Sequence, residues 1–110
     1  MSAPPDPVFA EAMNRLWEKY LPQIEERVAT LQRAADSLAS GDLPPVEQKK
    51  AASDAHKLAG VLGTFGLNHG TDLAREAETL YEGSEDEMRR LTTRLAAIAE
   101  KLQAMIADRK

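Results

Sequence analysis

The 110-residue sequence contains no cysteine, and its aromatic residues are one tryptophan, two tyrosines and two phenylalanines. Without cysteine, disulfides and thiolate metal sites are excluded. Few aromatics in a sequence rich in alanine and leucine favour helices over strands. No apolar run approaches the roughly 20 residues that a membrane-spanning helix needs, so we expect no membrane association.

An excess of positive charge is also missing. Lysine and arginine total 14 against 18 acidic residues, which gives a formal net charge of −4. Dispersed basic residues cannot form the basic face that a nucleic-acid partner requires, so no such partner is expected. The start of the chain lacks the basic and apolar segments of a signal peptide, which favours a cytoplasmic location. The acidic, well-mixed surface favours a monomer.

Apolar residues are present at alternating three- and four-residue steps, the period of amphipathic helices. A short first helix is expected from Pro7 to an interruption or kink at Pro22, and a second helix from there to Gly41. Ser84 opens the last helix with a capping box, and this helix is expected to run unbroken, burying Leu91 among others. Two further helices are expected over residues 45–66 and 68–83.

Short connections make successive helices antiparallel neighbours. The sequence therefore predicts an all-α fold: an up-down-up-down antiparallel four-helix bundle with an additional short N-terminal helix. Residues 7–110 are expected to form this single domain, and residues 1–6 a flexible, proline-rich leader.

One histidine lies on the outer side of the third expected helix. At roughly 100° per residue, His56 falls roughly 140° from the centre of the apolar stripe formed by Leu58 and Leu62. Gly66 is expected to end the helix. The residues on the histidine's side are small apart from one lysine, so that a partner has close access to the imidazole: Lys49, Ala52, Ser53, Ala59, Gly60 and Gly63.

Few kinds of chemistry fit this surface. The chain has no glycine-rich phosphate loop and so no recognisable ATP site, and no serine or cysteine nucleophile is paired with a base. His56 and His69 are thirteen residues apart, which does not indicate a metal site. The remaining candidate is His56 as a nucleophile, because a neutral imidazole has a lone pair that can accept a phosphoryl group.

At these residues the chain resembles the histidine-containing phosphotransfer (HPt) domain family of two-component phosphorelays. The matching positions are His56, Leu58 two residues on, Gly60 four on and Gly66 ten on. The resemblance implies a phosphohistidine carrier in which His56 accepts a phosphoryl group from a receiver-domain aspartate or a hybrid histidine kinase. The carrier then passes the group to the aspartate of a response regulator, whose receiver domain supplies the Mg²⁺; this chain itself is expected to bind no cofactor.

The resemblance also suggests supporting residues. Gly60, with Gly63, would keep the docking face open, and Glu78 occupies the position at which a side chain of the next helix hydrogen-bonds the imidazole. As an alternative, Glu78 is an ordinary surface acid. The family usually has a basic residue three positions after the histidine, where this chain has Ala59; Lys57 either compensates or is simply solvated.

Two other interpretations remain open. The chain would be a non-catalytic helical adaptor if its small-residue face docks a receiver or a partner helix without phosphorylation of His56. It would be a pH-sensing docking surface if protonation of His56 controls binding.

Overall fold

The computed structural model describes residues 6–109, which form five α-helices and no strand. This confirms the all-α class. The first five residues of the expected leader lie outside the described residues. Its last residue, Asp6, caps the first helix by accepting a hydrogen bond from the Val8 N–H at 2.8 Å. The helices are α1 (Pro7–Ala39), α2 (Pro45–Thr64), α3 (Asn68–Tyr81), α4 (Glu85–Arg90) and α5 (Thr92–Arg109).

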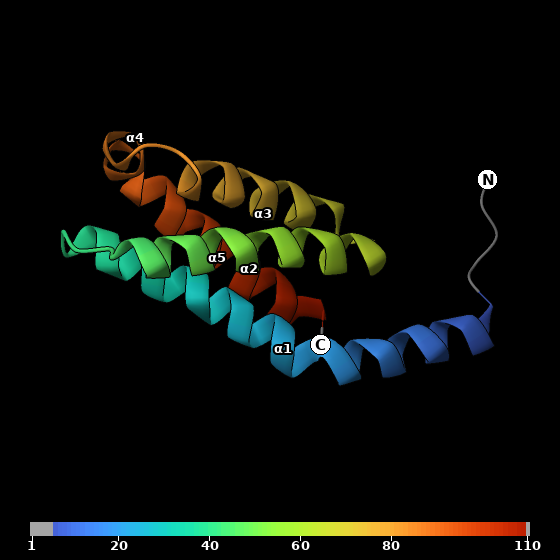
Figure 1. The fold of residues 1–110 in the computed structure, drawn as a ribbon. Helices are drawn as coiled ribbons and strands as arrows, with labels where there is room; N and C mark the ends of the chain where they lie inside the picture. Colours follow the sequence, from blue (N-terminus) through green and yellow to red (C-terminus); the bar gives the residue numbers. More distant parts are fainter. Residues whose placement is uncertain (1–5, 110) are drawn as a thin grey trace.

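Four of these helices form the bundle, and α4 is a short connection between α3 and α5 (Figure 1). Helix α2 packs against α1 on one side and α3 on the other, while α5 closes the ring against α1 and α3. Successive long helices run in opposite directions in Figure 1, so the up-down-up-down arrangement is confirmed.

The prediction of a separate, short N-terminal helix is wrong. Its residues form the first part of α1, a continuous helix of 33 residues with Pro22 inside it. Proline lacks the N–H that would bond to the carbonyl four residues earlier, which bends a helix and does not always end it. Pro22 is exposed, so water can reach the freed backbone, and α1 bends along its length in Figure 1.

The last predicted helix also differs, because it is divided in two. Ser84 caps α4 as expected, accepting a hydrogen bond from the Glu87 N–H at 3.2 Å. Helix α4 ends after Arg90, and α5 begins at Thr92. Leu91, between them, is 37% exposed and is not part of the core. The break lets the chain turn from the end of α3 into the fourth position of the bundle.

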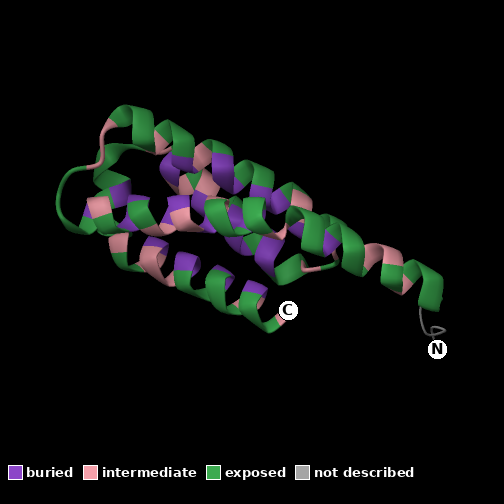
Figure 2. Cartoon of the chain, turned by 90° about the horizontal axis from the view of Figure 1, so that it is seen from below, coloured by how far each residue is buried: buried purple, intermediate pink, exposed green. Residues whose placement is uncertain are grey.

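The core is aliphatic and lies where the long helices face one another, as the buried stripes in Figure 2 show. Its largest fully buried aliphatic side chains are Ile24, Leu31, Leu58, Leu62, Leu95, Ile98 and Leu102. Trp17 begins this core on α1, and its ring meets that of Phe65 edge-on at 5.1 Å between centroids.

The part of α1 before Trp17 extends beyond the bundle and is mostly exposed (Figures 1 and 2). Phe9 is 60% exposed and Leu16 is 39% exposed. The apolar stripe that predicted a short first helix is therefore largely exposed, with Met13 half-buried. Within that described part of the chain, no helix combines the length and apolar character that a bilayer crossing requires.

Candidate functional site

His56 lies near the middle of α2, on the side away from the core. Ala55 and Leu58 of the same helix are fully buried, whereas the His56 side chain is 73% exposed. The helical period explains the difference, because residues one apart are rotated by roughly 100° about the axis. The apolar stripe of α2 thus anchors the helix and leaves the imidazole in solvent.

Glu78 of α3 holds one side of this imidazole. Its Oε2 lies 2.9 Å from Nδ1 of His56, and its side chain is only 23% exposed. An ionised carboxylate can only accept a hydrogen bond, so Nδ1 must carry the proton in this contact. In the neutral ring that assignment leaves the lone pair on Nε2.

Helix α3 lies close to α2 beside the histidine, and two small residues of α2, Ala59 and Gly63, lie at this contact. The hydroxyl of Thr71 donates to the carbonyl oxygen of Ala59 at 2.9 Å. A Cβ at Gly63 would lie 3.3 Å from that hydroxyl oxygen, whereas a Cβ at Gly60 would meet nothing within 4 Å. Gly63 is thus at the contact between α2 and α3, and only Gly60 leaves open space beside His56.

Ala59 also differs from its expected place on the docking face. It is only 6% exposed and belongs to the packed surface beneath that face. The helical period places Ala59 on the histidine's side of α2. Helix α3 nevertheless covers it, because Thr71 and its neighbours lie against this stretch of α2. Of the other expected docking residues, Lys49 and Ser53 are exposed and Ala52 is half-buried. Lys57 is exposed as well.

Two open hollows flank His56. The first, of about 370 Å³, lies between α2 and α3 and is lined by His56, Ala59, Gly60, Arg75, Glu78 and Thr79. The second, of about 530 Å³, lies toward the start of α2 and is lined by Gln48, Lys49, Ala52, Ser53, His56, Glu78, Tyr81 and Glu82. The structure therefore brings together most of the expected site residues, while Lys57 and Gly63 line neither hollow.

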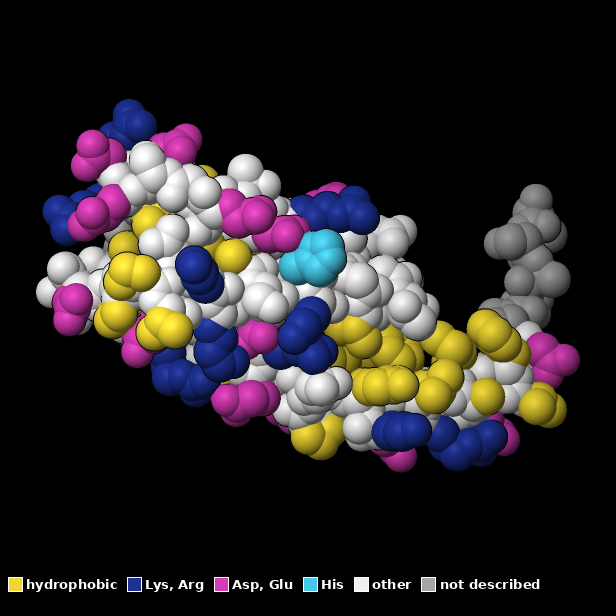
Figure 3. Space-filling model, viewed as in Figure 1, with side chains coloured by type: hydrophobic (Ala, Val, Ile, Leu, Met, Phe, Trp, Pro, Cys, Tyr) yellow, Lys and Arg dark blue, Asp and Glu magenta, His cyan; other side chains and the backbone are white. Residues whose placement is uncertain are grey.

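Sequence reasoning missed Arg75 and Thr79. Both come from α3, and Arg75 precedes Glu78 by three residues, which puts the two on neighbouring positions of one helix surface. This three-residue spacing from Glu78 is the sequence signal that could have identified Arg75 as a site residue. Figure 3 shows an exposed histidine on this face with lysine or arginine and acidic side chains around it.

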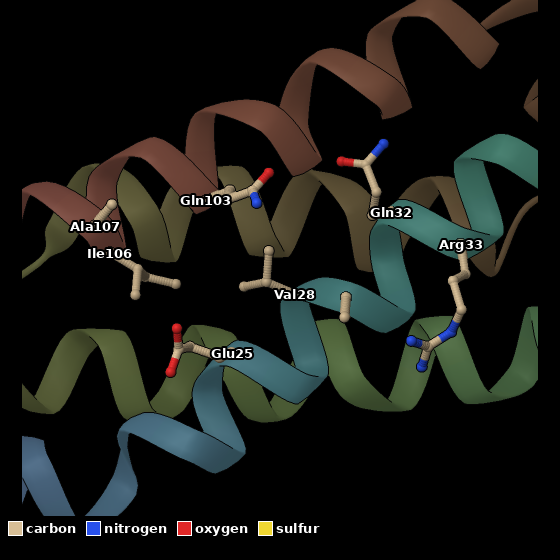
Figure 4. Close-up of a pocket in the computed structure, with 8 residues that line it drawn as sticks. Glu25, Val28, Gln32, Arg33, Gln103, Ile106 and Ala107 are labelled. Atoms are coloured by element: carbon tan, nitrogen blue, oxygen red, sulfur yellow. The ribbon is translucent and has the colours of Figure 1, made fainter.

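A third hollow, of about 400 Å³, lies between α1 and α5 and does not include His56 (Figure 4). Its charged residues are Glu25 and Arg33, and Arg33 forms an ion pair with Glu26 at 3.1 Å. It contains no histidine and so offers no nucleophile of the kind found on α2. Residues 6–109 contain no cluster of three or more histidine, aspartate or glutamate residues suited to a metal ion.

Comparison with known proteins agrees with this geometry. A family model for the Hpt domain matches residues 15–108. Protein RcaC of Microchaete diplosiphon is similar, being 36% identical over 73 residues, which cover 66% of this chain and 11% of that protein. The chain thus spans about a tenth of that relative's length. No solved structure gives a significant match. With 94 of its 110 residues matched, the chain belongs to the Hpt domain family, whose role is histidine phosphotransfer in phosphorelays.

Proposed function

We propose that His56 is the phosphoryl carrier of this chain. It accepts the group from a receiver-domain aspartate or a hybrid histidine kinase and passes it to the aspartate of a response regulator. The observation that supports this most is the hydrogen bond between Nδ1 and Glu78, together with the 73% exposure of the imidazole.

In the transfer step, the Nε2 lone pair attacks the phosphorus of the aspartyl phosphate. A nitrogen–phosphorus bond forms, the bond from phosphorus to the aspartate oxygen breaks, and the carboxylate leaves with the electron pair. The ring gains positive charge, which the Glu78 carboxylate stabilises through Nδ1–H. Phosphoryl transfer needs little further covalent chemistry, so this chain supplies position and access.

The partner supplies the rest of the site. A receiver domain docks over α2 and α3, on the surface formed by Lys49, Ala52, Ser53 and Gly60, and it brings the Mg²⁺ that neutralises the transferring group. The open space at Gly60 supports this placement, because a side chain there would stand between the partner and the imidazole.

The test is transfer of radiolabelled phosphate from a phosphorylated receiver or hybrid kinase to the purified chain. We expect label that is lost in acid and retained in alkali, the behaviour of a phosphoramidate. His56→Gln abolishes the label, whereas His69→Gln, which removes the other exposed histidine, retains it. Label that persists in His56→Gln would overturn the proposal.

The same experiment separates the adaptor alternative. If the chain is an adaptor, its His56→Ala variant binds the receiver with the same affinity as the wild type, and neither form carries label. Measuring receiver binding beside transfer therefore distinguishes the two functions.

A further inference from the structure

The hollow of about 370 Å³ beside His56 is where the negative charge of a phosphoryl group would need to be neutralised. A phosphoryl group on the imidazole carries about two negative charges when fully ionised. Three residues after His56, at the position where a basic side chain would face it from α2, the chain has Ala59, which is buried and uncharged. The charge must be balanced from another element or by solvent.

Arg75 enters the same hollow from α3. It lines this space together with His56, Ala59 and Gly60. Because α2 and α3 are antiparallel and Thr71 bonds to Ala59, the next turn of α3, which carries Arg75, lies beside the stretch of α2 between Ala59 and His56. Arg75 therefore borders, from α3, the region that Ala59 leaves uncharged on α2.

Two carboxylates close to Arg75 along α3, those of Glu76 and Glu78, are engaged elsewhere, whereas Asp72, three residues before it, is exposed to solvent. Glu76 binds Arg94 of α5 through two contacts of 2.6 and 2.7 Å, and these hydrogen bonds hold the pKa of the Glu76 carboxyl below its usual range. Glu78 is bonded to His56. Among residues 6–109, no hydrogen bond or ion pair engages the Arg75 guanidinium. Its donors are available for an anion.

We infer that this hollow is the phosphoryl subsite, in which Arg75 binds the phosphoryl oxygens carried by His56 and the Thr79 hydroxyl donates a further hydrogen bond. This inference rests on the proposed function. Guanidinium suits the task, since its fork of N–H donors matches two phosphoryl oxygens at once. Arg75 thus takes the place of the basic residue absent at Ala59.

Other charged groups also surround His56. Lys49 lines the second hollow, on the opposite side of the ring, and Lys57 is exposed but lines neither hollow. Glu78 and Glu82 contribute negative charge from α3. Any titration of a phosphoryl group here reports on all of them, so the test needs variants that change one charge at a time.

The test uses the full chain phosphorylated by phosphoramidate, a small donor that needs no receiver. Phosphorus-31 NMR then follows the ionisation of the phosphoryl group with pH. Removing a cation disfavours the dianion, so Arg75→Gln raises the pKa of the phosphoryl group by about half a unit, the size expected of one charge at an exposed site. Arg75→Lys keeps the charge and retains most of the wild-type value.

The matched control is Arg90→Gln on α4, an exposed arginine outside both hollows, which leaves the pKa of the phosphoryl group unchanged. Arg75 is exposed, so its variants are expected to fold, and circular dichroism checks this. If wild type and Arg75→Gln titrate alike, Arg75 is not a phosphoryl ligand, although the proposed function stands. If neither phosphoramidate nor a phosphorylated receiver places phosphate on His56, both proposals fail.

Discussion

At the scale of single residues, the site consists of one imidazole and the side chain that orients it. His56 is free to rotate on an exposed helix face unless something holds the ring, and the 2.9 Å contact with Glu78 does so. Fixing the proton on Nδ1 matters for a nucleophile, because it determines which nitrogen offers the lone pair. Glu78 acts through His56 and is thus a positioning residue.

This leads to a prediction for Glu78. Glu78→Ala removes the acceptor, so a larger fraction of the neutral ring carries its proton on Nε2, and the rate of phosphoryl transfer falls roughly tenfold. Glu78→Gln keeps an acceptor oxygen and retains most of the rate. Nitrogen-15 NMR of the imidazole measures the tautomer directly, and an unchanged tautomer in Glu78→Ala would contradict the assigned role.

At the scale of helices, close packing of α3 against its neighbours positions Glu78 and Arg75. The turn from α2 into α3 contributes, since Gly66 adopts a φ of +73° and the Leu67 N–H donates to the Leu62 carbonyl at 2.9 Å. This ends α2 sharply and returns the chain directly into α3. Gly70, in the first turn of α3, then permits the contact with α5.

Gly70 therefore provides a test of the packing. A Cβ there would lie 2.8 Å from Sδ of Met105 and 3.0 Å from Cδ1 of Leu62, so Gly70→Val overpacks the interface and lowers the free energy of unfolding by about 2 kcal/mol. The control is Gly60→Val, whose Cβ meets nothing within 4 Å and which changes stability by less than about 0.5 kcal/mol. Urea unfolding followed by circular dichroism measures both. Equal stability of the two variants would show that α3 can move away from α5 at no cost.

At the scale of the whole molecule, the bundle and the projecting part of α1 are different structures. The radius of gyration is 15.2 Å, above the roughly 13 Å expected of a compact domain of this size. The excess length belongs to the start of α1, where Trp17 is the first buried residue. The Hpt family match also begins within this segment, at residue 15.

Residues 10–16 project from the bundle, and Asn14 accepts one hydrogen bond there, from Arg109 at 3.3 Å. A helical segment with few tertiary contacts opens locally more often than one in a core. We therefore expect backbone amides of residues 10–16 to exchange with deuterium at least about a hundredfold faster than those of residues 24–38. Hydrogen exchange with mass spectrometry on dilute protein measures this within a single helix. Equal protection of the two segments would mean that the exposed apolar stripe is covered in solution.

Much of the fold and part of the site were predictable from sequence. The three- and four-residue apolar period predicted the inward faces of α2 and α5, because burial of a stripe is a local property of each helix. The same helical period placed His56 on the outer side of α2. The Glu78 position came from the family resemblance, and the structure shows the expected hydrogen bond to His56. The continuity of α1 through Pro22 was not predictable in this way, since the cost of a proline depends on whether water reaches the freed carbonyl.

The sequence by itself determined which residues face the core, where α2 ends and that the His56 side chain is left in solvent. These follow from the helical period, the left-handed preference of glycine and the burial of apolar side chains. Only the tertiary structure decided that α3 covers Ala59 and lies against the exposed Gly63, that α4 and α5 are separate, and that Arg75 shares a hollow with His56. These depend on the distance and rotation between helices, which packing fixes and which no single helix pattern contains.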